Sequence, residues 1–144
     1  MFALLLALAV ASATPPAPTQ RPAPTHFLWP ADGTVTTPFV PDGHPGLDIG
    51  ILRSLTVRAS AAGRVRLVGE QSGYEGYGRI VLVGVGGGYS TLYAHLSRFF
   101  VQPGDEVAAG QPLGIAGCTG WCTGTHLHYE LRLNGVAVPP RLSR

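Results

Sequence analysis

The sequence predicts a single domain that is mostly β, with few or no helices outside its N-terminal segment. The 144 residues allow one domain with a real core and leave no room for a second. With 20 Gly, 13 Pro, 45% hydrophobic and 12% charged residues, the composition favours short strands joined by tight turns. The apolar runs of the folded part are short, rich in β-branched and aromatic residues, and bounded by glycine, which is typical of strands.

The first 26 residues have the composition of an export signal followed by a tether. Residues 1–13 combine an apolar run with Ala11-Ser12-Ala13, which fits the small-x-small rule for cleavage of a signal peptide. No Lys or Arg precedes the run, so the alternatives are a true start upstream of Met1 or an uncleaved anchor, although the run is too short to span a membrane. Residues 14–26 form a Pro-rich linker that favours polyproline II, and His26 lies in it as a solvated side chain. We therefore expect a secreted protein, extracellular or periplasmic in the cell envelope, without stable membrane insertion once the signal is cleaved.

The folded domain is expected at residues 27–140, followed by a short tail at 141–144. Asp32-Gly33 predicts a turn after the first strand, and Asn134-Gly135 predicts a hairpin turn near the end of the domain. The polar, Gly-rich stretch 70–78 predicts an exposed loop, whose two tyrosines either line a groove or pack structurally. In chain order, the predicted strands are 28–29, 35–39, 56–59, 63–69, 79–85, 89–95 and a strand that begins at His126.

The strand that begins at His126 carries the most informative pattern in the chain. Successive side chains of a strand point to opposite faces, so His126, His128 and Glu130 share one face. The apolar residues between them point to the other face. Neutral imidazole is the commonest protein ligand for zinc and titrates near neutral pH, so the pair suits metal binding or general base catalysis. Two partly exposed strand histidines are the alternative.

Two further segments carry candidate ligands. Pro45 and Gly46 exclude a helix, and in the resulting extended segment His44 and Asp48 lie four residues apart on one face. An imidazole and a carboxylate at that spacing form half of a metal site. His95 ends an apolar strand, where it is either part of the same site or a core histidine with one hydrogen bond.

The two cysteines, Cys118 and Cys122, bracket the turn before the His126 strand. In an exported chain with an even count of cysteines, we expect a disulfide between them. It would stabilise the fold by about 2 kcal/mol at most, since the loop is short, and would hold the turn that aims His126 and His128. A zinc site built from the two thiolates is the alternative.

The charge pattern argues against nucleic acid as a partner. The chain has ten Arg, no Lys and eight acidic residues, and no cluster of Arg with interleaved aromatic residues. A mildly basic surface of this kind fits anionic cell-wall polymers.

Taken together, these segments resemble a known family, the lysostaphin-like (LytM-type) zinc endopeptidases. The resemblance covers residues 27–140 and rests on four motifs in the right order. These are Gly43-His44-x-x-x-Asp48, Tyr93-Ala94-His95-Leu96, Val101-x-Pro103-Gly104-Asp105-x-Val107-x-x-Gly110-Gln111 and Thr119-Gly120-x-x-Thr123-Gly124-x-His126-Leu127-His128-Tyr129-Glu130. It implies a compact antiparallel β-sheet with a long groove across it.

The resemblance also implies roles for individual residues. It assigns one zinc ion per chain to His44, Asp48 and His128, and catalytic roles at the attacking water to His95 and His126. Glu130 either orients a ligand imidazole from the second layer around the metal or is an ordinary surface carboxylate. Some relatives carry a tyrosine ahead of the first motif that helps hold the oxyanion, whereas residues 37–41 here contain none.

The function implied is that of a secreted zinc endopeptidase that hydrolyses peptide bonds in bacterial peptidoglycan, in its stems or cross-bridges. We expect it to act as a monomer. The alternative is a wall-binding regulatory module that activates another cell-wall hydrolase, but such members lack one or more of the five residues, and all five are present here. A hydrolase of a lactam or ester would show a His-x-His-x-Asp-His cluster, and Glu130-Leu131 departs from that pattern.

Overall fold

The structure, a computed structural model, describes residues 20–144, which form thirteen strands and no helix. The predicted all-β domain is therefore confirmed. The predicted signal peptide, 1–13, and the first part of the linker lie outside the described residues. Among the described residues there is no helix long and apolar enough to cross a membrane.

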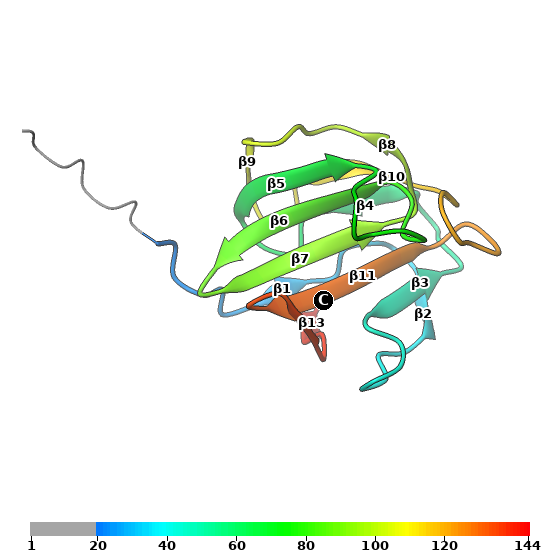
Figure 1. Ribbon diagram of the computed structural model, residues 1–144, viewed down its shortest axis with the longest axis horizontal. Coiled ribbons are helices and arrows are strands. Elements are labelled where there is room, and N and C mark those ends of the chain that lie inside the picture. The colour runs from blue at the N-terminus through cyan, green and yellow to red at the C-terminus, as the bar shows by residue number, and fades with distance from the viewer. Residues whose placement is uncertain (1–19) are drawn as a thin grey trace, which may run out of the picture.

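The larger sheet has eight strands and forms the frame of the domain (Figure 1). Its strands are Thr34–Thr37 (β2), Leu47–Gly50 (β3), Gly63–Gly69 (β5), Ile80–Gly86 (β6), Tyr89–Ala94 (β7), Glu106–Val107 (β9), Leu127–Leu133 (β11) and Val136–Val138 (β12). They follow the order β2-β3-β11-β7-β6-β5-β9, with β12 also paired to β11. All of these pairs are antiparallel, and β11 lies between β3 and β7.

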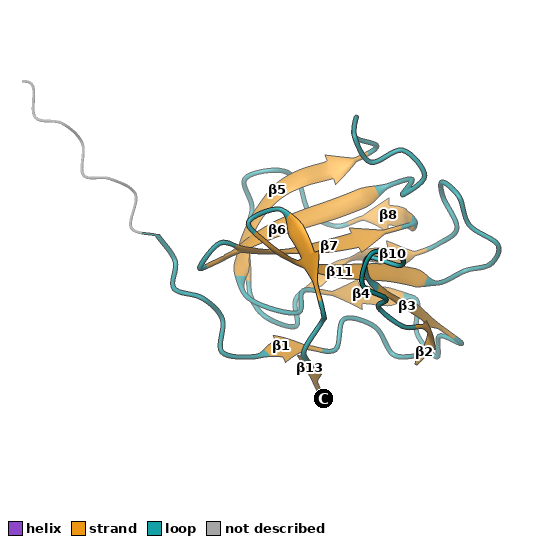
Figure 2. Ribbon diagram, turned by 60° about the horizontal axis from the view of Figure 1, so that its bottom comes forward, coloured by secondary structure: helices purple, strands orange, loops and turns teal. Residues whose placement is uncertain are grey.

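Two smaller sheets complete the fold (Figure 2). Strands Thr56–Arg58 (β4), Pro112–Ala116 (β10) and Leu96–Phe99 (β8) form a three-stranded antiparallel sheet in the order β4-β10-β8. Strands Phe27–Leu28 (β1) and Leu142–Ser143 (β13) pair in parallel, so the predicted tail contributes a short strand beside the start of the domain.

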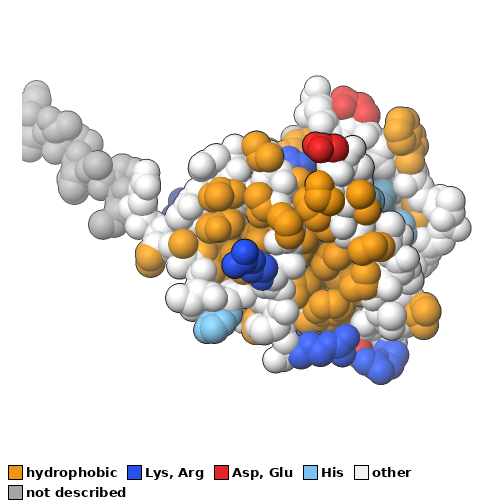
Figure 3. Space-filling model, turned by 90° about the horizontal axis from the view of Figure 1, so that it is seen from below, with side chains coloured by type: hydrophobic (Ala, Val, Ile, Leu, Met, Phe, Trp, Pro, Cys, Tyr) orange, Lys and Arg blue, Asp and Glu red, His pale blue; other side chains and the backbone are white. Residues whose placement is uncertain are grey.

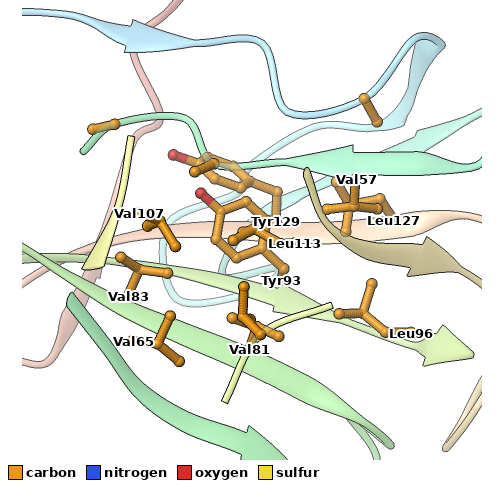
Figure 4. Close-up of a cluster of buried hydrophobic side chains, with 14 of the residues drawn as sticks. Val57, Val65, Val81, Val83, Tyr93, Leu96, Val107, Leu113, Leu127 and Tyr129 are labelled. Atoms are coloured by element: carbon orange, nitrogen blue, oxygen red, sulfur yellow. The ribbon is translucent and has the colours of Figure 1, made fainter. Parts of the chain in front are cut away.

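The core lies between the larger sheet and the three-stranded sheet (Figure 4). From β11, Leu127 and Tyr129 are fully buried and Leu131 is nearly so, which confirms the alternation read from the sequence. The three-stranded sheet contributes Val57 and Leu113 to the same cluster. The phenol groups of Tyr93 and Tyr129 both hydrogen-bond to the hydroxyl of Ser60, so no polar atom of these rings is left unpaired in the core.

The opposite face of the larger sheet carries a second, smaller apolar cluster. Its buried members come from β6 and β7, and Tyr74 and Tyr77 of the loop 70–78 pack against them. This loop was predicted to be exposed. Its polar residues are on the surface, but its two tyrosines fold down onto the sheet and bring the loop close to His95, which follows β7, and to His128 of β11.

The described part of the predicted linker contacts the domain. Arg21 forms an ion pair with Glu106, and its carbonyl oxygen accepts a hydrogen bond from the backbone N–H of Gly87. His26 is exposed, as expected. On the face of the molecule shown in Figure 3, hydrophobic side chains are widespread and charged side chains are few and scattered, in keeping with the low charged fraction of the chain.

Candidate metal centre

The register of three neighbouring strands gathers the predicted site residues at one place. Asp48 on β3 is the pairing partner of His128 on β11, and on the other side of β11 His128 pairs with Ala94 of β7. His95 directly follows Ala94. His126 lies one residue before β11, and His44 lies in the loop before β3. Segments far apart in the sequence therefore converge at the end of β11.

His44, Asp48 and His128 form a group that could hold a metal ion. One ligand atom from each lies within 4.8 Å of the others. Asp48 Oδ1 is 2.8 Å from His128 Nδ1 and 3.2 Å from His44 Nε2. Two imidazoles and one carboxylate that leave further positions open match the ligand set of a catalytic zinc site.

The second nitrogen of each of these two imidazoles is held by an acceptor. His44 Nδ1 lies 2.9 Å from the carbonyl oxygen of Pro38, and His128 Nε2 lies 2.9 Å from Glu130 Oε1. An imidazole that donates its proton to such an acceptor presents its other nitrogen to a metal. His44 Nε2 and His128 Nδ1, the two nitrogens that face Asp48, are therefore the available ligand atoms.

Asp48 is ionised at neutral pH. Burial on its own would raise the pKa of this carboxyl group, but the hydrogen bond with His128 and the nearby charges of His128, His44 and His126 lower the pKa to about 2. The side chain of Asp48 is thus a carboxylate that attracts a cation.

His95 and His126 lie beside the three potential ligands without belonging to that group. Their ring centroids are 4.7 Å apart, and His126 Nε2 lies 3.7 Å from Asp48 Oδ1. A backbone carbonyl oxygen holds the Nδ1 atom of each ring. His95 Nδ1 lies 2.7 Å from the carbonyl oxygen of Thr119, and His126 Nδ1 lies 2.8 Å from that of Gly124. The Nε2 atoms are then free to accept protons.

Two properties of His95 set it apart from an ordinary strand histidine. Burial, together with the neighbouring imidazoles, lowers its pKa, so it is neutral at pH 7. Its backbone has a φ of 62°, in the left-handed region that non-glycine residues rarely adopt. Backbone strain of this kind concentrates at functional sites, where the surrounding structure holds it.

Glu130 connects the site to the interior of the protein. It is fully buried, which excludes the alternative of a surface carboxylate. Its Oε1 accepts hydrogen bonds from His128 Nε2 at 2.9 Å and from the hydroxyl of Tyr77 at 2.6 Å, and its Oε2 accepts one from Arg132 Nε at 2.6 Å. Burial would raise the pKa of Glu130, but these three hydrogen bonds lower it, so the carboxylate is charged at neutral pH.

Neither Tyr77 nor Arg132 was predicted from the sequence as a partner of Glu130. For Arg132 a signal was present, since it lies two residues after Glu130 and so shares its face of β11. For Tyr77 there was none, because the contact spans 53 positions of sequence. Burial, followed by the hydrogen bond to Glu130, raises the pKa of Tyr77 to about 12, so the phenol remains a proton donor.

The predicted disulfide between Cys118 and Cys122 is present in the structure. It excludes the alternative of a thiolate zinc site at these positions. The loop that it closes lies next to the histidines, and Cys122 Sγ is 3.7 Å from His126 Nδ1.

An open cleft with a volume of about 520 Å³ lies over the candidate site. All five predicted metal and catalytic residues line it, and Tyr77, Glu75 and Trp121 form part of its walls. The cleft gives a substrate access to the open side of the group formed by His44, Asp48 and His128.

The sequence of residues 42–140 matches Peptidase family M23. The chain belongs to this family. Among curated M23-like relatives, it is 43% identical over 97 residues to the DD-carboxypeptidase/endopeptidase Mpg of Neisseria meningitidis, a match of 67% of this chain and 22% of that protein. It is 34% identical over 116 residues to the murein hydrolase activator NlpD of Escherichia coli, a match of 79% of this chain and 30% of that protein. The M23 domain described here thus spans less than a third of either relative.

Solved structures show the same fold. A zinc-containing peptidase from Vibrio cholerae superimposes with a TM-score of 0.71 at 26% identity, over 86% of this chain and 41% of that one. The antimicrobial peptidase lysostaphin from Staphylococcus simulans superimposes with a TM-score of 0.65 at 28% identity, over 82% of this chain and 52% of that one. The resemblance to lysostaphin-like peptidases that the motifs indicated is therefore confirmed, and this chain shares its fold with lysostaphin and with a zinc-containing peptidase.

Proposed function

We propose that this M23 domain is a zinc-dependent endopeptidase that hydrolyses peptide bonds in the stem or cross-bridge peptides of bacterial peptidoglycan. The observation that carries the proposal is the convergence of His44, Asp48 and His128 to within 4.8 Å, with the Nε2 atoms of two further histidines free beside them. Membership of a peptidase family and the fold of lysostaphin support it.

In this proposal one zinc ion per chain is held by His44 Nε2, Asp48 Oδ1 and His128 Nδ1. These donors fit zinc because they combine two imidazole nitrogens with an ionised carboxylate and leave a further coordination position open to the cleft. When bound, zinc polarises the scissile carbonyl and lowers the pKa of water to roughly 7. Glu130 acts on His128, holding the Nε2 proton so that Nδ1 faces the metal.

His95 and His126 carry out the proton transfers. His95 is neutral at pH 7 because burial lowers its pKa, so its Nε2 can accept a proton from the attacking water. His126 Nε2 lies 3.7 Å from the Asp48 carboxylate, and in the form that carries a proton on both ring nitrogens His126 donates a hydrogen bond to the tetrahedral oxyanion or protonates the departing amine. Both side chains line the cleft, from which a substrate peptide would reach them.

The site of action is the cell envelope. The apolar segment at residues 1–13 and the Pro-rich linker at 14–26 support export. Relatives of the chain include proteins named as a murein hydrolase activator and as a lipoprotein, the latter YgeR of Escherichia coli with 34% identity over 116 residues. A secreted or periplasmic monomer would meet peptidoglycan there.

A second candidate function is that of a wall-binding module that activates another hydrolase. The similarity to NlpD favours it. The complete set of five residues favours the enzyme, because a docking module needs neither the metal donors nor the free histidines.

Purified protein incubated with peptidoglycan sacculi separates the two functions, with soluble products analysed by mass spectrometry. The enzyme releases fragments with new amino termini on stem or bridge peptides. If zinc-loaded protein binds sacculi and releases no peptide by itself, while it stimulates release by an added wall hydrolase, the activator is correct.

A further inference from the structure

One large apolar side chain stands exposed on the wall of the cleft. Trp121 is 84% exposed, the greatest exposure among the large hydrophobic residues that the structure describes. Trp121 lines the cleft together with the candidate metal and catalytic residues. A single exposed aromatic residue needs no explanation in general, but one at the wall of an active-site cleft is a candidate contact for a ligand.

The disulfide loop and the neighbouring loop 70–78 both contact Trp121. It lies inside the loop closed by Cys118 and Cys122, and its backbone N–H donates a hydrogen bond of 2.8 Å to the carbonyl oxygen of Gly76. The ring rests against Gly76, where a Cβ atom would lie only 2.9 Å from a ring carbon. Glycine at position 76 therefore makes room for the indole, and the rest of the ring surface is exposed.

The residue before Gly76 supplies a negative charge in the same cleft. Glu75 is exposed and lines the cleft with Trp121. Hydrogen bonds from the backbone N–H groups of Gly73 and of Glu75 itself lower the pKa of its carboxyl group, so the group is ionised at neutral pH. Among residues 20–144, Glu75 forms no ion pair, whereas Asp48, the other carboxylate of the cleft, faces three histidines.

An exposed indole and a carboxylate without an ion pair, both in the lining of one cleft, are together complementary to a cation. The face of Trp attracts ammonium groups, and a carboxylate adds a charge-assisted hydrogen bond. The lining of the cleft includes no Arg, and the chain has no Lys, so no permanently cationic side chain within this lining competes for Glu75, and the histidines of the lining gather around Asp48. A sugar ring would use the indole but has no need of the charge at Glu75.

We propose that Glu75 and Trp121 form a subsite that binds a primary ammonium group of the substrate peptide next to the cleaved bond. The inference rests on the proposed function and deepens it, because it names a charged group that the peptide must carry. Trp121 and Glu75 act in binding, so their effect falls on KM more than on kcat.

The test uses a synthetic cross-linked stem peptide with one free side-chain amine and the same peptide with that amine acetylated. We expect zinc-loaded wild-type protein to prefer the free amine by about 10-fold in kcat/KM, and raised ionic strength to reduce this preference. Glu75→Gln should reduce the ratio to about 2 or below while zinc content stays at one per chain, and Trp121→Ala should reduce it as well. Glu70→Gln, which removes an exposed carboxylate outside the cleft lining, is the matched control and should keep the wild-type ratio.

The outcomes separate this inference from the proposed function. Cleavage of both peptides at equal rates by wild-type protein overturns the subsite and leaves the endopeptidase intact. A ratio that Trp121→Ala changes and Glu75→Gln does not also overturns it, in favour of apolar or sugar stacking. If wild-type protein cleaves neither peptide nor sacculi, the proposed function fails. The subsite is then tested by calorimetry: wild-type protein should bind the free-amine peptide with a lower Kd than the acetylated one, and Glu75→Gln protein should lose this difference.

Discussion

Asp48 of β3 and His128 of β11 are paired across the sheet, and their Oδ1 and Nδ1 atoms are 2.8 Å apart. Both positions lie in strands that pair with each other through backbone hydrogen bonds, so the sheet itself positions two of the three proposed ligands. Metal sites built on strands keep their geometry better than sites built on loops. The third proposed ligand, His44, reaches the site from a loop and is held by its contact with Pro38.

Replacement of the proposed ligands should separate them from the catalytic histidines. His44→Ala, Asp48→Ala and His128→Ala each remove one of three protein bonds to zinc, so metal content and activity should fall together. His95→Ala and His126→Ala remove no such bond, so zinc should stay near one per chain while turnover falls by roughly 100-fold or more. Metal analysis beside assays on sacculi distinguishes the groups, and loss of zinc in His126→Ala with retention in His128→Ala would reverse the assignment.

Glu130 should control the affinity for zinc through His128. Glu130→Gln replaces a charged acceptor by a neutral amide at His128 Nε2, and loss of such a partner typically lowers metal affinity by about 10- to 100-fold. Competition with a chelator measures the affinity. Glu70→Gln serves as control, and equal affinities for the two variants would show that Glu130 does not act on the metal centre.

The stability difference between wild-type protein and Glu130→Gln should depend on pH in a defined direction. The folded-state pKa of Glu130 lies below its ordinary value of 4.5, so its stabilisation is fully present above pH 4.5 and is lost as pH falls through the folded-state pKa. In metal-free protein at pH 7, Glu130→Gln should lower the free energy of unfolding by about 2 kcal/mol, because Arg132 loses its buried partner. Urea denaturation at falling pH should show this difference shrinking. A difference that grows in acid contradicts the account.

The disulfide should matter more for activity than for global stability. Alkylation without reductant should label neither Cys118 nor Cys122. The double variant Cys118→Ser/Cys122→Ser should lose about 2 kcal/mol of unfolding free energy at most, since the closed loop is short. Activity should fall by roughly 10- to 100-fold, because the loop carries the Thr119 carbonyl that holds His95 and lies against His126. A fully active double variant would show that the disulfide is not needed to position His95 and His126.

The sequence predicted the parts of this molecule that depend on local periodicity. Strict alternation along β11 placed Leu127 and Tyr129 in the core, and the spacing of His44 and Asp48 in an extended segment predicted that they converge. The division of five residues into ligands and catalysts came from family resemblance alone, because spacing cannot say which imidazole nitrogen is held by a carbonyl oxygen.

What the sequence could not predict depends on contacts between distant segments. The three-stranded sheet was missed as a unit, since β8 follows His95 without a turn signal and β10 is interrupted by Gly114. The burial of Glu130 was open for a similar reason. Only the folding of loop 70–78 onto the sheet brings the hydroxyl of Tyr77 to its carboxylate and closes it off from water.

Titration of metal-free protein with zinc, with new amino termini released from sacculi as the readout, tests the central proposal most directly. We expect no release without metal, a linear rise in rate with added zinc and a plateau at one equivalent per chain. Release that is independent of zinc, or no release at any zinc concentration by protein that still binds sacculi, would contradict it.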